Sequence, residues 1–426
     1  MQFVFQITYN CNLRCEYCYQ PKTENRVLKK EEAFEFIDEW FKYYNTDESK
    51  IFSVYMENHD KPDHYILNFF GGEPLLYPDL VMDIIDYFKD SCIKNDLGRL
   101  WDNTTVMLQT NGTLIQTPGV LALKDKHKGH IIWHITFEGT EECQDAKRKF
   151  ADGSGSYKII KENIEYLKEE LQDQELKRFP NKLTFTKDTI DMILPVTKAL
   201  IKLGYHHCAL DYDTTTQMTV EESEKYYQAL CRSIDYTVDN HLRFYPRHLG
   251  YTYNNEPRIN SCGASGASIC IGPGGTISNC DKANASYMEN LASQTILGNV
   301  KDGITNLECL DELRHLEERR IEPEQCLNCP IRHMCDECPM ENLKINGHIH
   351  KYWKNCGWIV AQARAQKYFY EKVKADPSYP YYKKTIQHIE ETNMYDPNYR
   401  YWYLDNYETE WIDKSIEFTA EENIRD

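Results

Sequence analysis

Short apolar runs alternate with amphipathic stretches through the first half of the chain, and this alternation restricts the possible folds more than any other feature. Runs with the length and composition of strands lie at residues 3–9, 65–70, 105–110, 130–137, 182–186 and 207–212. Helical periodicity lies at residues 29–44, 79–92, 157–171 and 190–203. Six strands with helices between them predict an α/β fold with a parallel sheet, either open or curled into part of a barrel.

Four short motifs directly follow the first four predicted strands. They are the cysteine-rich stretch at 11–20, GGEP at 71–74, TNG at 110–112 and FEG at 137–139. In α/β folds of this kind the active site lies at the carboxyl ends of the strands. We therefore expect these motifs to contribute to one site.

The second half of the chain is less regular. Periodicity fades after about residue 221, and residues 260–358 are rich in Cys, Gly and Pro, which predicts a region stabilised by bound metal. From residue 359 onward the sequence becomes helical and crowded with tyrosine, as expected of terminal helices with aromatic packing. A chain of 426 residues exceeds what one core usually serves. The predicted domains are residues 1–240, 255–358 and 359–426.

The composition argues against two kinds of partner. A formal net charge of -18, from 49 Lys and Arg against 67 Asp and Glu, opposes binding to a phosphate backbone, so nucleic acid is not expected. The amino terminus has no basic leader and no apolar run approaches the length of a membrane span, which predicts a cytoplasmic protein without membrane contact. Sixteen cysteines in a reducing compartment indicate metal or cluster ligands rather than disulfides.

Cys11, Cys15 and Cys18 follow the pattern C-x3-C-x2-C directly after the first predicted strand. A structural zinc ion normally takes four protein ligands, and no nearby fourth Cys or His completes the set. Three thiolates on a cluster of four irons leave one iron without a protein ligand. Such an open iron predicts that a substrate or cosubstrate is the fourth partner.

This arrangement resembles the radical SAM superfamily, whose signature is C-x3-C-x-aromatic-C, with Tyr17 as the aromatic residue here. The resemblance implies a partial (β/α)6 TIM-type barrel. It also implies that the open iron binds S-adenosylmethionine through its amino and carboxylate groups. One electron, supplied by an external donor such as flavodoxin or ferredoxin, then cleaves it to methionine and a 5'-deoxyadenosyl radical.

The motifs after the second and third strands fit the same family. Gly71 and Gly72 allow a close backbone approach, and Glu73 is expected to accept hydrogen bonds from the ammonium of the methionine moiety. The resemblance places Asn111 near the ribose.

Two further segments extend the expected cosubstrate site. TFEG resembles a family segment usually written S-x-D-G, in which Thr136 and Glu138 replace the usual Ser and Asp. Arg148 is expected to pair with the cosubstrate carboxylate because a guanidinium binds a carboxylate through two bonds. A surface arginine that caps a loop is the alternative for Arg148.

A second group of eight cysteines lies in the later region. Its members are Cys262, Cys270, Cys280, Cys326, Cys329, Cys335, Cys338 and Cys356. Eight thiols suffice for two four-iron clusters or for two zinc ions. Only five residues separate Cys329 from Cys335, whereas zinc ribbons separate their C-x2-C pairs by about 15 to 20 residues, so the spacing disfavours a ribbon.

The order C-x12-G-x4-C, C-x2-C-x5-C and two more cysteines resembles the SPASM extension of radical SAM enzymes that modify peptides. Here two residues lie between Cys335 and Cys338, where the family pattern has three. Cys270 is either a ligand or a buried thiol, and in the second case cluster I has an open iron that can bind a substrate thiol. The resemblance assigns Cys262, Cys270, Cys280 and Cys338 to auxiliary cluster I, and Cys326, Cys329, Cys335 and Cys356 to auxiliary cluster II.

Residues 137–157 resemble radical SAM maturases of peptides with repeated C-x-x-x units. The function expected from this resemblance is oxidative modification of a ribosomally made, Cys-containing precursor peptide, with thioether crosslinking as the product. Formylglycine formation of the anaerobic sulfatase-maturing type is the alternative within enzymes. A non-catalytic zinc-binding interaction protein is the alternative from a different class.

Three smaller predictions concern residues outside these motifs. Asp211 and Asp213 end the sixth predicted strand and are candidate general bases, although an acid at a strand end can instead face solvent or cap a helix. GPGGT at 272–276 predicts a tight hairpin that presents Cys280. The remaining cysteines are expected to be small core residues, namely Cys92, Cys143, Cys208, Cys231 and Cys309.

Overall fold

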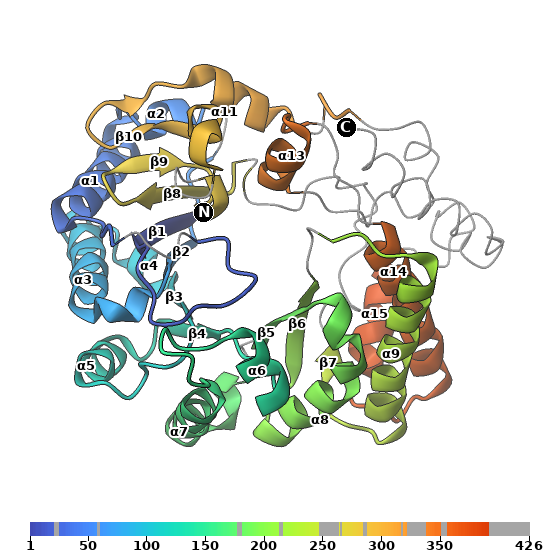
Figure 1. The fold of residues 1–426 in the computed structure, drawn as a ribbon. Coiled ribbons are helices and arrows are strands. Elements are labelled where there is room, and N and C mark those ends of the chain that lie inside the picture. Colours follow the sequence, from blue (N-terminus) through green and yellow to red (C-terminus); the bar gives the residue numbers. More distant parts are fainter. Residues whose placement is uncertain are drawn as a thin grey trace. The chain divides into compact units, whose positions relative to one another are not determined.

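The computed structural model divides into two compact units (Figure 1). It describes residues 1–20, 25–57, 60–176, 181–212, 216–246, 264, 266–283, 288–316, 318–321, 338–350 and 356–391. The first unit contains Met1–Thr136, Asp145–Leu167 and Cys262–Arg319, and the second contains Phe137–Gln144, Lys168–Ser261 and Arg320–Asp426. Within the described ranges, no helix is both long enough and apolar enough to cross a membrane.

One sheet forms the centre of the first unit. Its strand order is β11-β10-β9-β8-β1-β2-β3-β4, and β8, β1, β2, β3 and β4 run parallel. The parallel strands are β1 (Gln2–Thr8), β2 (Tyr65–Gly71), β3 (Thr104–Thr110), β4 (Ile131–Ile135) and β8 (Ser268–Gly272). The antiparallel strands are β9 (Thr276–Ser278), β10 (Ile296–Asn299) and β11 (Gly303–Ile304).

The two faces of β1 differ in chemistry. Phe3 and Phe5 project to one side, where the ring of Phe3 lies 5.3 Å from Trp40 and 5.5 Å from Phe36 on α1. Because side chains alternate along a strand, Val4 and Gln6 project to the opposite side. The aromatic side is the hydrophobic core, and the other side carries polar groups next to the carboxyl ends of the strands.

The helices of the first unit separate the parallel strands along the chain (Figure 1). They are α1 (Lys30–Thr46), α2 (Phe52–Tyr55), α3 (Pro78–Lys94), α4 (Gly98–Asp102), α5 (Pro118–His127) and α11 (Leu307–Arg314), with the short 3₁₀-helices η1 (Pro74–Leu76), η5 (Asp281–Ala283) and η6 (Glu289–Gln294). The helices α6 (Glu141–Lys147) and α7 (Tyr157–Leu176) contribute residues to both units.

The second unit has a smaller sheet and a helical layer. Its parallel strands are β5 (Asn181–Phe185), β6 (His207–Tyr212) and β7 (Tyr245–Pro246). Its helices are η2 (Lys187–Met192), α8 (Ile193–Leu203), α9 (Val220–Asp239), α13 (Pro339–Asn346), α14 (Cys356–Ala375) and α15 (Tyr382–Glu391). The buried ring of Trp358 on α14 packs 4.9 Å from Tyr226 on α9.

The six predicted strands are confirmed, but they belong to two sheets. In the first unit β4 ends at Ile135, and in the second Phe137 donates its N–H to the carbonyl of Lys182 on β5 at 3.0 Å. The hairpin at Pro273–Gly275 is confirmed, since Gly272 pairs with Thr276. The boundaries of the three predicted domains stay a prediction.

The sequence reading failed to identify α9. This helix begins after Thr219, whose hydroxyl accepts from the N–H of Glu222 at 3.2 Å while the Glu222 carboxylate accepts from the N–H of Thr219 at 2.8 Å. Such a reciprocal cap is visible in sequence as T-x-x-E before an amphipathic run. The signal was therefore present.

Candidate active site

The cysteine loop begins directly after β1. Cys15 is buried, and Cys11 and Cys18 are half-buried. The end of α6 and the residues just after it fix the loop, because Arg14 and Glu16 donate their N–H groups to the carbonyls of Lys149 and Lys147 at 2.7 and 3.0 Å. The three thiols therefore occur on a backbone that is held in place by hydrogen bonds.

The environment of Cys11 fits a ligand of an iron–sulfur cluster. The Leu13 N–H and the Asn111 side-chain amide point at its sulfur from 3.4 and 3.7 Å, and such hydrogen bonds tune cluster thiolates. Burial and the nearby charges of Glu73, Cys15 and Cys18 raise the pKa of Cys11 to about 12. No three Cys, His, Asp or Glu side chains among the described residues gather around a position for one metal ion.

Gly71 and Gly72 bring the end of β2 against the start of the cysteine loop. Gly71 has φ 140°, and a Cβ at Gly72 would lie 2.1 Å from the carbonyl oxygen of Asn10. Gly72 donates its N–H to Thr8 at 2.7 Å, and Glu73 donates its N–H to Asn10 at 2.9 Å. The close approach predicted for these glycines therefore occurs, and here its partner is the backbone that carries Cys11.

Glu73 is completely buried and joins the ends of β2 and β3. One carboxylate oxygen accepts from the Thr110 hydroxyl at 2.7 Å and from the Leu75 N–H at 3.1 Å, and the other accepts from the Asn111 N–H at 2.7 Å. Burial raises the pKa of Glu73 to about 7, against the opposing effect of these donors and of the Arg148 charge. The second oxygen retains a lone pair for a further donor.

Asn111 links the third strand to the cysteine loop. Its side-chain amide donates to Asn12 at 2.8 Å and approaches Cys11, while its oxygen accepts from the backbone and hydroxyl of Thr113 at 3.0 and 2.7 Å. The predicted association of the first three strand-end motifs is therefore seen in the structure.

Arg148 lies beside the aromatic residue of the cysteine motif. It is 5% exposed, which excludes a surface arginine, and it donates to the Tyr17 hydroxyl at 3.0 Å. Its charge also lowers the pKa of Glu73, so the two side chains interact across the site. A positive charge therefore lies near the cysteine loop.

The fourth motif is divided. In the first unit, Thr136 donates its N–H to the carbonyl of Thr110 at 3.1 Å. In the second unit, the buried carboxylate of Glu138 accepts from the N–H of Thr184 on β5 at 3.1 Å, and the Glu138 N–H donates to Gln144 at 3.0 Å. Glu138 thus has a role in fixing its own loop to β5.

The structure identifies a Tyr–Asp pair that the sequence reading missed. The hydroxyl of the half-buried Tyr19 donates to the carboxylate of Asp281, and Lys282 lies 5.4 Å from the Tyr19 ring centre. Burial, Asp281 and the charges of Cys18 and Cys280 raise the pKa of Tyr19 well above its usual value. Tyr19 directly follows Cys18, and Asp281 directly follows Cys280. This position next to two predicted cluster ligands was the signal in the sequence that could have identified the pair.

The later cysteines occupy different surroundings. Cys270 lies inside β8 and is 1% exposed, an environment that favours the buried thiol over the ligand. Cys280 is half-buried after β9, and in the second unit Cys338 and Cys356 are half-buried at the starts of α13 and α14. Outside the described residues lie Cys262, Cys326, Cys329 and Cys335.

Two groups of smaller predictions have different outcomes. Four cysteines expected in the core are buried, namely Cys92, Cys143, Cys231 and Cys309. The side chain of Cys208 lies outside the described residues. Asp211 belongs to β6, but its side chain and the whole of Asp213 lie outside them too, so the predicted base stays a prediction.

Comparison with known proteins agrees with this site. Residues 5–179 match the family model described as the Radical SAM superfamily. The chain is 22% identical over 347 residues to the radical SAM cyclopropyl synthase TigE of Paramaledivibacter caminithermalis, covering 77% of this chain and 65% of the relative. It is 29% identical over 160 residues to a cysteine-type anaerobic sulfatase-maturating enzyme of Clostridium novyi, covering 37% of each. The matched regions span less than two thirds of these relatives.

Two solved structures show the fold. Native anSMEcpe with bound AdoMet superposes with a TM-score of 0.63 at 16% identity, covering 93% of this chain and all of the other. Streptococcus suis SuiB bound to precursor peptide SuiA superposes with a TM-score of 0.53 at 14% identity, covering 82% of this chain and 74% of the other. The predicted fold class, α/β with a radical SAM partial barrel and additional helices, is therefore confirmed.

Proposed function

We propose that this protein is a radical SAM enzyme that oxidatively modifies a side chain of a ribosomally made peptide. The observation that carries the proposal is the hydrogen-bonded assembly of the cysteine loop, the GGE turn and Asn111 at the carboxyl ends of β1, β2 and β3. When bound there, a four-iron cluster with one open iron supplies the electron that cleaves S-adenosylmethionine to methionine and a 5'-deoxyadenosyl radical.

The proposed contacts to S-adenosylmethionine use side chains that can accept a further hydrogen bond or that carry a charge. Glu73 accepts from the ammonium group through its less occupied oxygen, and Arg148 pairs with the carboxylate. Asn111 acts near the ribose while it holds the loop of Cys11. Burial of these side chains excludes water from the place where a radical would otherwise be quenched.

We propose thioether crosslinking of a Cys-containing precursor peptide as the reaction. One hydrogen atom would pass from a peptide carbon to the 5'-deoxyadenosyl radical, which becomes 5'-deoxyadenosine, and the thiol proton would pass to a base. One electron leaves through the auxiliary cysteine sites, and a carbon–sulfur bond forms. Asp281, which accepts from the Tyr19 hydroxyl, is proposed as a candidate for the base beside Asp211 and Asp213.

Three four-iron clusters are proposed in all, one in the loop with Cys18 and two auxiliary clusters held by seven of the eight later cysteines. Cys280, close to Tyr19, supports an auxiliary site near the cysteine loop. Because Cys270 is enclosed in a strand, auxiliary cluster I is proposed to keep an open iron for the substrate thiol. Flavodoxin or ferredoxin is the proposed electron donor.

Formylglycine formation is the second candidate. It is supported by the name of the Clostridium novyi relative and by the length over which the fold resembles anSMEcpe. A peptide substrate is supported by the titles of the SuiB structure with SuiA and of anSMEcpe with a Kp18Cys peptide.

Two measurements on anaerobically reconstituted protein test the proposal. About twelve irons per chain with matching sulfide are expected for three clusters, and reductant should release 5'-deoxyadenosine from S-adenosylmethionine. Co-production with Cys-containing peptides encoded beside the gene should give a product that has lost two hydrogens and kept its sulfur. Loss of sulfur with gain of an aldehyde would establish formylglycine instead, and zinc without iron would exclude an enzyme of this class.

A further inference from the structure

A pair of carboxamides is buried next to the cysteine loop. Gln6 on β1 is 0% exposed and Gln20, two residues after Cys18, is 6% exposed. The side-chain N–H of Gln6 donates to the Gln20 oxygen at 3.3 Å. Among the described residues, neither the Gln6 oxygen Oε1 nor the Gln20 nitrogen Nε2 has a hydrogen-bond partner.

Unpaired buried polar atoms oppose folding, so their presence needs an explanation. The oxygen and nitrogen positions of both amides can be exchanged without changing this result. In either orientation one N–H donor and one oxygen acceptor remain unpaired. The pair is neutral and therefore suits a neutral ligand that has one acceptor and one donor on the same side. The N–H and C=O groups of one residue in an extended peptide have this arrangement.

The position of the pair connects it with the proposed reaction site. Gln6 projects to the side of β1 opposite the aromatic core and pairs in register with Phe70 on β2. The ring of Tyr19 stacks on Phe70 at 6.5 Å, so the segment that carries Cys18 covers this end of the sheet. Gly272 on β8 has no side chain over the Gln6 oxygen, where a Cβ would lie 3.1 Å away.

We propose that Gln6 and Gln20 bind the main chain of the peptide substrate, an inference that rests on the proposed function. Gln6 Oε1 accepts from the N–H of one substrate residue, and Gln20 Nε2 donates to the carbonyl of the same residue. The predicted contacts to S-adenosylmethionine come from the ends of β2 and β3 and from Arg148, whereas this pair lies at β1 and β8. The two amides therefore act as specificity-determining residues that hold an extended peptide near Cys18.

The first test measures thermal unfolding of the reconstituted enzyme without peptide. Replacing both amides (Gln6→Met with Gln20→Met) should leave the melting temperature unchanged or raise it, because two unpaired groups are removed. Asn163→Leu is the matched control, since Asn163 is 3% exposed and both its amide atoms are bonded, to Gly112 at 2.7 Å and to Gln116 at 2.9 Å. This control should lower the melting temperature. A similar loss in the double variant would show a structural role and overturn the proposal.

The second test uses the peptide that the wild-type enzyme modifies. The double variant should raise KM for that peptide about tenfold or more, with kcat, KM for S-adenosylmethionine and iron content unchanged. N-methylation of the bound amide should impair the wild type strongly and the double variant little, because the contact is already absent. An unchanged peptide KM, or a raised KM for S-adenosylmethionine instead, overturns the proposal. Failure of the proposed function is distinct, because the wild type itself would then modify no peptide.

Discussion

The two neighbouring parallel strands β1 and β8 each bring a cysteine to the first unit, and the two thiols differ in what they can bind. Cys11 lies three residues beyond the end of β1, half-buried, with two N–H donors directed at its sulfur. Cys270 lies in the middle of β8, paired with Val4 on one side and with Ser278 on the other. Cys11 belongs to a loop beyond a strand end and is half-buried, whereas Cys270 is 1% exposed and covered by the surrounding chain.

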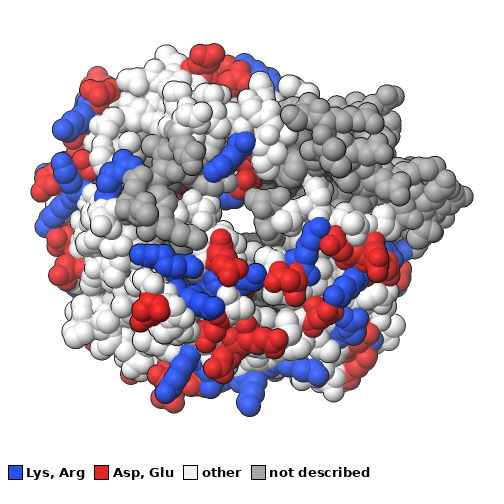
Figure 2. All heavy atoms as spheres, viewed as in Figure 1, with Lys and Arg blue, Asp and Glu red and all other residues white. Residues whose placement is uncertain are grey.

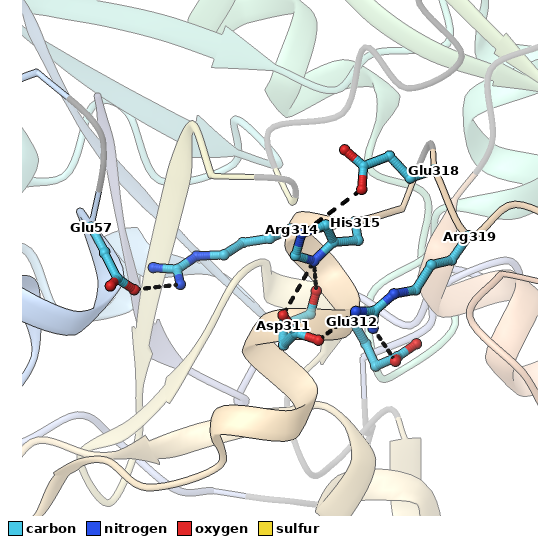
Figure 3. A network of polar contacts seen from close by, with 7 residues as sticks. All are labelled: Glu57, Asp311, Glu312, Arg314, His315, Glu318 and Arg319. Carbon is cyan, nitrogen blue, oxygen red and sulfur yellow. Dashed lines mark hydrogen bonds and ion pairs between the residues drawn. The ribbon is translucent and has the colours of Figure 1, made fainter.

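The regions around these cysteines are also stabilised differently. Backbone hydrogen bonds and the buried carboxylate of Glu73 hold the cysteine loop. The chain that follows β8 to β11 ends in α11, where exposed ion pairs dominate (Figure 3). There Arg314 donates to Glu57 and to the carbonyls of Val54 and Tyr55. Acidic and basic side chains are also mixed on the face shown in Figure 2. A further ion pair of the described residues joins Lys126 and Asp86 at 2.6 Å.

The sharpest test of the difference between Cys11 and Cys270 replaces each of these two cysteines by serine. Cys11→Ser should remove about four irons per chain and abolish release of 5'-deoxyadenosine, because a cubane with one open iron cannot lose another ligand and still bind the cosubstrate. Cys270→Ser should leave the iron content unchanged. Iron and sulfide analysis with a cleavage assay measures both.

Cys92→Ser is the matched control for the effect of replacing a buried cysteine by serine. Cys92 is 0% exposed and far in sequence from all predicted cluster ligands. If Cys270→Ser loses as much iron as Cys11→Ser, Cys270 is a cluster ligand and the distinction between the two strands is wrong.

Gly72→Ala should produce the next largest effect. Its Cβ would lie 2.1 Å from a backbone oxygen of Asn10, which cannot move without displacing the loop of Cys11. The free energy of unfolding should fall by about 2–4 kcal/mol, with reduced iron retention. Denaturant unfolding and iron analysis provide the measurement.

Gly98→Ala is the control for this substitution, because nothing lies within 4 Å of the added Cβ at the start of α4. It should change the free energy of unfolding by less than about 1 kcal/mol. Equal losses in the two variants would contradict the steric explanation.

Glu73→Gln should change how stability depends on pH. The pKa of Glu73 is about 7 in the folded chain and about 4.3 when unfolded, so the unfolded state releases its proton first as pH rises. In the wild type the contribution of Glu73 to the free energy of unfolding is fully present below pH 4. It is lost as the pH rises to about 7, a loss on the order of 3 kcal/mol. The variant lacks this loss.

Denaturant unfolding of cluster-free protein at pH 5 and pH 8 measures the difference. Relative to wild type, the variant should gain stability at the higher pH. A constant difference between the two proteins at both pH values would show that Glu73 is ionised throughout.

The smallest effects are expected in the network on α11. Arg314→Ala should cost about 1 kcal/mol, because its guanidinium is partly buried and also bonds two carbonyls. Arg319→Ala should have a smaller effect that disappears in high salt, because its partners Asp311 and Glu312 are exposed. Unfolding of both variants in low and high salt tests this order. A larger loss for Arg319→Ala would contradict it.

Much of the fold was predictable because strand and helix periodicity is local. The runs at 65–70 and 105–110 became β2 and β3 almost without change. The motifs after them met at one edge, as parallel strands require. By contrast, the pairing of β8 with β1 joins residues more than 260 positions apart, and no local pattern specifies such a partner.

The sequence by itself determined the identity and spacing of Cys11, Cys15 and Cys18, the order of strands and helices, and the hairpin before Cys280. These features depend on neighbours along the chain. Only the tertiary structure decided that Cys270 is enclosed, that Tyr19 bonds Asp281, and that Gln6 and Gln20 are buried with unpaired atoms. Burial and hydrogen bonding depend on which distant segments pack together, and that is a property of the folded chain alone.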